Sequence, residues 1–178
     1  MPDRTRAPAL GRLMVLLAYC LLGALIVVRA TQVRGLEALT CEPLIAILTV
    51  GSHHTMAVGD VVYFGLQSSA AVGLQITNEC STAVLIIPFL LIMGGVGLRP
   101  TVRVSRVVLA TLAGIGMLLA VNVIRIGGIG WATYHWGTTD GYRWSHLVIG
   151  SLLALAGFAL SVLVALRILV RGGDRVAR

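Results

Sequence analysis

Four long stretches of the chain are rich in apolar residues and almost free of charge. They cover residues 13–28, 80–98, 107–130 and 146–170. A hydrocarbon core about 30 Å thick requires about 20 apolar residues in a helix. The pattern therefore predicts a single membrane domain of the all-α integral class, with about four transmembrane helices.

The segment 29–79, between the first two spans, has a different pattern. The apolar run 44–50 follows Cys41, Glu42 and Pro43 and is too short to cross a bilayer, so it indicates an interfacial or re-entrant helix. Further along, the tripeptide Gly-Leu-Gln occurs at 65–67 and again at 73–75, which predicts a small β-hairpin. An irregular interfacial loop is the alternative.

Composition supports the membrane assignment. Hydrophobic residues make up 57% of the chain, charged residues make up 12%, and the mean hydropathy is +0.93. These values exclude an ordinary water-soluble domain. The net charge of +7 would fit a nucleic-acid partner, but the positions of the charges explain it otherwise.

All 14 basic residues are arginines, and ten of them lie before the first span, between the second and third, or from Arg167 near the end of the last span onward. Because cytoplasmic loops carry the excess of Arg, we expect both termini in the cytoplasm of a multi-pass cell-membrane protein. Segments 29–79 and 131–145 are then extracytoplasmic, and no nucleic-acid partner is needed. A cleaved signal peptide is the alternative for span one, but no convincing cleavage site follows Val28.

Three chemically active residues share the outer membrane boundary under this topology. Cys80 begins span two, His146 begins span four, and Arg125 lies roughly 27 Å along the helix from Val107 at the inner side. A cysteine at a helix N-terminus near cations favours the thiolate, histidine transfers protons, and arginine stabilises an oxyanion. Together these groups predict acyl transfer through a thioester.

Each of these residues also has a structural interpretation. Cys80 pairs with Cys41 in a disulfide, or Arg125 and His146 are ordinary interfacial residues, and the protein is then a non-enzymatic membrane scaffold or assembly factor. His135 is the nearest rival to His146 as a base. The adjacent His53 and His54 bind one metal poorly, so we expect no metal and no cofactor. Glycines within the spans indicate close helix packing rather than phosphate binding: Gly94, Gly95, Gly97, Gly114 and Gly116.

Three motifs occur around these residues in one order along the chain. Glu79-Cys80-Ser81 begins one span, Asn122-Val123-Ile124-Arg125 lies near the end of the next, and His146-Leu147-Val148-Ile149-Gly150 begins the last. From about Gly65 to the end of span four, the chain thereby resembles the exosortase and archaeosortase family of membrane cysteine transpeptidases.

The resemblance implies a Cys–Arg–His enzyme at the extracytoplasmic face. Cys80 would be the nucleophile, His146 the general acid and base, and Arg125 the oxyanion-stabilising group, with Glu79 and Ser81 in supporting positions. The substrate would be a secreted protein with a C-terminal transmembrane helix and a basic tail. The new terminus would pass to water or to a lipid or surface-polymer acceptor.

One role is inferred from spacing rather than implied by the resemblance, and one residue departs from the family pattern. From helical spacing we infer that Asn122, one turn before Arg125, orients the guanidinium. Thr82 stands two residues after the cysteine, where many family members have glycine.

Overall fold

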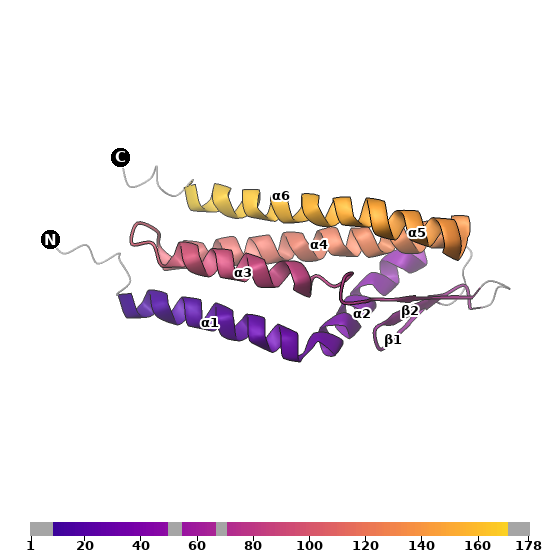
Figure 1. The fold of residues 1–178 in the computed structure, drawn as a ribbon, viewed down its shortest axis with the longest axis horizontal. Helices are drawn as coiled ribbons and strands as arrows, with labels where there is room; N and C mark the ends of the chain where they lie inside the picture. The colour runs from indigo at the N-terminus through magenta and orange to yellow at the C-terminus, as the bar shows by residue number, and fades with distance from the viewer. Residues whose placement is uncertain (1–8, 50–54, 67–70, 171–178) are drawn as a thin grey trace.

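The computed structural model describes residues 9–49, 55–66 and 71–170 (Figure 1). The chain is mostly helical, as expected, with a small sheet after the second helix. The helical elements are α1 (Ala9–Val28), α2 (Ala30–Leu48), α3 (Ala83–Gly97), α4 (Val104–Trp136), the π-helical turn η1 (Gly137–Gly141), α5 (Tyr142–Trp144), the π-helical turn η2 (Ser145–Ile149) and α6 (Gly150–Val170). The strands are β1 (Met56–Val58), β2 (Val61–Phe64) and β3 (Val72–Gln75).

Four helices, α1, α3, α4 and α6, run lengthwise beside one another (Figure 1). α4 and α6 pack against each other along most of their length, and the chain reverses between them through η1, α5 and η2. At the end of the bundle where α1 begins and α6 ends, Arg12 donates a hydrogen bond of 3.1 Å to the carbonyl of Pro100. This contact joins the start of α1 to the α3–α4 connection, so the arginine-bearing ends lie together.

Two helical segments are long and apolar enough to cross a membrane, as judged by length and composition. They are Ala9–Val28 and the continuous helical stretch Val104–Val170, which contains the reversal. α3 has 15 residues, fewer than the roughly 20 of an ordinary span.

The segment 131–145 was predicted to be a loop, and this prediction is wrong. α4 continues to Trp136, because nothing between Trp131 and Trp136 breaks a helix. It ends where Gly137 adopts a φ of 83°, a conformation that favours glycine. The residues that follow are also helical, so His146 lies on a helical turn and α6 begins four residues later.

The predicted hairpin is present within a three-stranded antiparallel sheet in the order β1-β2-β3. β2 and β3 pair from Val61 with Gln75 to Phe64 with Val72. The first Gly-Leu-Gln lies just beyond β2 rather than in it, because Gly65 turns out of the strand with a φ of 71°. β1 was not predicted; it joins β2 through a tight turn at Gly59 and Asp60.

The short helix predicted at 44–50 is the end of a longer helix, α2. This helix begins at Ala30 and buries one face, formed by Glu37, Ala38, Cys41 and Ile45, against the sheet and α4. Pro43 is exposed, so its missing N–H does not disturb the packed side. Val50 lies outside the described residues.

Close helix packing is confirmed at two of the glycines. A Cβ on Gly114 would overlap the ring of Phe89 on α3, and a Cβ on Gly94 would lie 2.7 Å from Cδ1 of Leu16 on α1. Gly95 and Gly116 face open space, with nothing within 4 Å of an added Cβ. The Phe89 contact belongs to a core shared by α3, α4 and α6.

Candidate functional site

Cys80 lies in a tight turn between the sheet and α3. Its N–H donates a hydrogen bond of 3.1 Å to the carbonyl of Thr77, and Ser81 N–H donates to the same carbonyl. The sequence placed Cys80 at the first residue of a span, but α3 begins only at Ala83. The thiol is therefore held by a turn rather than by a helix, and its side chain is 5% exposed.

His146 contacts this thiol directly. The distance from Cys80 Sγ to Nδ1 of His146 is 3.3 Å, within the range of a hydrogen bond to sulfur. The two residues are 66 positions apart in sequence. His146 lies on η2, one of the two π-helical turns at the reversal, and turns of this kind occur frequently at functional sites.

A second residue of the reversal, Tyr142 on α5, packs on the imidazole. The ring of Tyr142 stacks on His146 at a centroid distance of 5.1 Å and an interplanar angle of 6°. The rival base, His135, is exposed and contacts Trp131 and Tyr134 instead. Of these two histidines, it is His146 that approaches Cys80.

Arg125 reaches the same turn from α4. Its side chain is buried, and Nη2 donates a hydrogen bond of 3.4 Å to the backbone carbonyl of Glu79, the residue before Cys80. Nε is buried without a hydrogen-bond partner among the described residues. Gly150 on α6 makes room for it, because an added Cβ would lie 3.1 Å from Nε. Gly150, the last residue of the third sequence motif, thus leaves space for the side chain of Arg125.

The three residues that were predicted to support Cys80, His146 and Arg125 make different contacts. Ser81 Oγ accepts a hydrogen bond of 3.3 Å from the N–H of Ala83, at the start of α3. Glu79 contributes its backbone carbonyl, while its side chain is exposed. Asn122 is buried, but in the described part of the chain no hydrogen bond joins it to Arg125. The inference that Asn122 orients the guanidinium is not supported by a direct contact.

Glu37 on α2 is a residue that sequence reasoning missed. Its Oε1 accepts a hydrogen bond of 2.7 Å from the N–H of Thr82, and both residues are buried. Oε2 of Glu37 and Oγ1 of Thr82 have no partner among the described residues. Both residues line a cavity of about 400 Å³ between α2, α3 and α4, together with Asn122 and Cys41. A lone acidic residue within the apolar run Gly35–Leu39 was the available signal.

Tyr142 was also missed as a site residue. It lies four residues before His146, the spacing that brings two side chains onto one helical face. This relation was hidden because the segment was interpreted as a loop.

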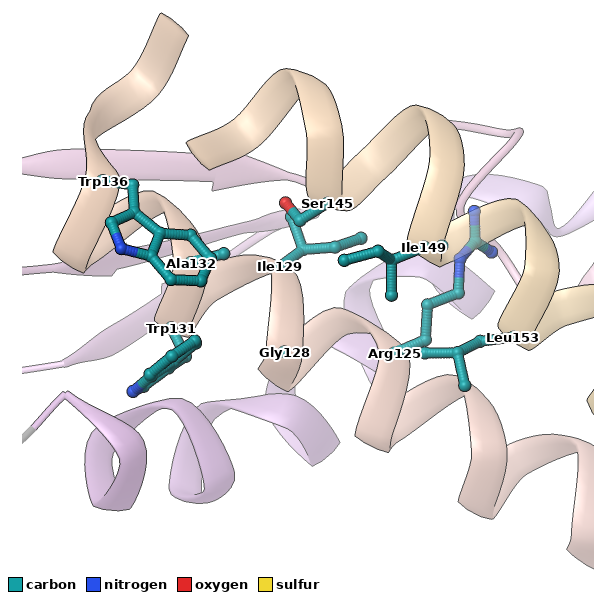
Figure 2. Close-up of a pocket in the computed structure, with 10 residues that line it drawn as sticks. Arg125, Gly128, Ile129, Trp131, Ala132, Trp136, Ser145, Ile149 and Leu153 are labelled. Carbon is teal, nitrogen blue, oxygen red and sulfur yellow. The ribbon is translucent and has the colours of Figure 1, made fainter. Parts of the chain in front are cut away.

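The thiol–imidazole pair is enclosed by apolar walls. A cavity of about 10 Å³ is bounded by Cys80 and His146, with Tyr142 and residues of β3 and α4 around them. A larger groove of about 200 Å³ lies between α4 and the η2–α6 segment (Figure 2). Arg125 lies at one end of this groove and Trp131 and Trp136 at the other. The cavity at the thiol is therefore small, and a larger groove lies nearby.

The remaining chemical expectations concern metals and disulfides. Among residues 9–49, 55–66 and 71–170, no three His, Cys, Asp or Glu side chains gather as a metal site requires. His53 and His54 lie outside these ranges. Cys41 and Cys80 are both free thiols, so the alternative disulfide between them is not formed.

Searches of family models, curated proteins and solved structures find no match to this chain. No relative therefore supplies an activity by similarity. The fold itself brings the thiol of Cys80, the imidazole of His146 and the guanidinium of Arg125 to one turn of the chain.

Proposed function

We propose that this chain is a membrane-embedded cysteine transpeptidase or protease of the exosortase and archaeosortase type. It processes the C-terminal sorting signals of secreted surface proteins through a thioester on Cys80. The observation that carries the proposal is the 3.3 Å contact between Cys80 Sγ and Nδ1 of His146, made beside the buried guanidinium of Arg125. A thiol with an adjacent base and a cation is the usual arrangement of an activated cysteine nucleophile.

The first half of the reaction forms the thioester. His146 accepts the thiol proton as the sulfur of Cys80 bonds to the carbonyl carbon of the substrate. The resulting oxyanion receives a hydrogen bond from Arg125, whose present bond to Glu79 is long at 3.4 Å and so is readily exchanged for a better acceptor. The C–N bond then breaks, and the imidazolium gives its proton to the leaving amine.

The second half releases the product. Water, or an amine or hydroxyl of a lipid or surface-polymer acceptor, attacks the thioester carbonyl while His146 takes the attacking proton. The C–S bond breaks, and the proton returns to the thiolate of Cys80. The products are a free carboxylic acid with water, or an amide or ester with the acceptor.

The surface of the helices supports a membrane location. Within the two segments of membrane-spanning length, few side chains are buried, so they are unlike the core helices of a soluble protein. Large apolar residues face outward on three helices, for example Leu17, Leu112 and Leu155. An exposed apolar surface of this extent favours contact with lipid. In the proposed topology, α1, α3, α4 and α6 span the membrane, and the thiol faces the extracytoplasmic side.

The test compares the C-termini of surface proteins in cells that express the wild type or Cys80→Ala. C-terminal peptide mass spectrometry should find a secreted protein shortened before its C-terminal helix and basic tail in the wild type, and full-length in the variant. Cys20→Ala is the matched control, because this exposed thiol lies on α1. Processing by Cys80→Ala at the wild-type level contradicts the proposal and favours the scaffold interpretation.

A further inference from the structure

The two edges of the small sheet differ in how their backbone groups are satisfied. At the β1 edge, the N–H of Ala57 points away from β2 and donates a hydrogen bond of 3.2 Å to Oε2 of Glu42 on α2. α2 packs along both β1 and β2. A side chain of the protein itself therefore caps this edge.

The β3 edge has no such cap. Ile76 N–H donates a hydrogen bond of 2.8 Å to the carbonyl of Asp60, which continues the β2–β3 ladder by one pair. Because hydrogen-bonded and non-hydrogen-bonded pairs alternate in antiparallel sheets, Leu74 and Val72 also face β2. The N–H and C=O groups of Gly73 and Gln75 therefore point to the open edge, and within the described residues no backbone group pairs with them.

This open edge borders a groove that leads to the nucleophile. The groove has a volume of about 280 Å³ and lies between β3 and the reversal of α4. Its walls are formed by Val72, Gly73, Leu74, Gln75 and Thr77 on one side and by Thr133, Thr138 and Tyr142 on the other. Leu74, Gln75 and Tyr142 also bound the small cavity at Cys80 and His146. The groove and the cavity at Cys80 are thus adjacent, with these three residues between them.

We infer that the substrate binds as an added fourth strand along β3, in an extended conformation, and so delivers its scissile carbonyl to Cys80. This inference rests on the proposed function and specifies how that site recognises its substrate. The outward groups of Gly73 and Gln75 pair with the peptide backbone, which gives affinity with little dependence on sequence. An unpaired strand edge is a ready template for such pairing.

Pairing with β3 would use the N–H groups of every second substrate residue, and a synthetic probe can detect this alternation. Only alternate residues of an added strand direct their N–H groups toward β3. The probe is acetyl-Val-Ala-Val-Ala chloromethyl ketone, which alkylates a thiol at its C-terminal end. Two isomers are compared, one N-methylated at both valines and the other at both alanines. The readout is the rate of Cys80 modification by mass spectrometry, in full-length protein lacking Cys20 and Cys41.

One methylated isomer should react at least about tenfold more slowly than the unmodified probe, and the other at a similar rate, because only one set of N–H groups pairs with β3. Two isomers with equal rates overturn the inference. On the protein side, Gln75→Pro removes one outward N–H without breaking the β2–β3 ladder, since proline is tolerated on edge strands. It should slow the peptide probe relative to Gln75→Ala, which also removes the side chain but keeps the N–H, while the two variants react with iodoacetamide at equal rates.

The two proposals fail in different ways. If iodoacetamide modifies Cys80 at the same rate with and without His146→Ala, the proposed function is wrong, and the inference drawn from it falls as well. If that rate depends on His146 but both methylated isomers react alike, only the added-strand inference is overturned.

Discussion

The N–H of Thr82 donates a hydrogen bond of 2.7 Å to Oε1 of Glu37. This contact joins α2 to the start of α3, two residues beyond Cys80. The first N–H groups of a helix have no partner within the helix, so a buried helix start requires an acceptor from elsewhere. Glu37 supplies it and thereby holds the turn that carries Cys80.

Removal of this acceptor should destabilise the protein. Glu37→Ala leaves the buried N–H of Thr82 without a partner and should lower the free energy of unfolding by about 1–3 kcal/mol. Glu37→Gln keeps an oxygen acceptor and should lose less. Thermal unfolding in detergent micelles measures both effects, with Asp140→Asn as a control because Asp140 is exposed on η1. An alanine variant as stable as the wild type would show that the contact is dispensable.

The stacked ring of Tyr142 should determine how well His146 is oriented toward the thiol. Tyr142→Ala should slow alkylation of Cys80 at neutral pH roughly three- to tenfold, the equivalent of losing one aromatic contact. Tyr142→Phe keeps the ring and should stay near the wild-type rate. If both variants slow the reaction equally, the hydroxyl rather than the stacked ring is the important group.

Cys41 should make the protein sensitive to alkaline pH. Burial, and then the neighbouring Glu37, raise the pKa of the Cys41 thiol to about 12. The folded state thus holds this proton more tightly than the unfolded state, so the resulting stability is present below the unfolded pKa and is lost as the pH rises toward 12. Between about pH 8 and about pH 10.5, the Tm of the wild type should fall more than that of Cys41→Ala. If the Tm of the two proteins falls equally with pH, the raised pKa of the Cys41 thiol is contradicted.

Two glycines on α4 provide a matched pair for helix packing. Gly114→Ala would drive a methyl group into the ring of Phe89 and should lower stability by about 1–3 kcal/mol. Gly116→Ala faces open space and should be neutral or should stabilise the helix by up to about 1 kcal/mol. Thermal unfolding of the two variants side by side measures the difference. An equal loss of stability in the two variants would indicate that α3 does not pack on Gly114.

Cys80, Arg125 and His146 could be predicted as a set because the charge pattern and the span lengths placed all three at one expected depth. The structure brings them together from a turn, the interior of α4 and the η2 turn. The sheet was predicted only in part, since the repeated tripeptide marks two strand ends. β1 is a strand of three residues and carries no comparable signal.

The residues that surround Cys80, Arg125 and His146 could not be predicted in the same way, because tertiary contacts that are not visible in the sequence pattern bring them there. Glu37 and Thr82 are 45 positions apart and meet only because α2 folds back across α4. Tyr142 was hidden by the interpretation of its segment as a loop, which removed the helical spacing to His146. The uncapped edge of β3 follows from strand order and register, neither of which the sequence determined.

In the proposed function, His146 and Arg125 activate the thiol of Cys80, and the reactivity of this thiol measures that activation. In protein lacking Cys20 and Cys41, a membrane-impermeant alkylating reagent is added over a range of pH, and modification of Cys80 is followed by mass spectrometry. We predict rapid modification at neutral pH that slows when either His146→Ala or Arg125→Ala is introduced, while Arg143→Ala, an exposed arginine on α5, leaves it unchanged. Slow modification that neither His146→Ala nor Arg125→Ala alters would contradict the account and leave Cys80 as a structural residue.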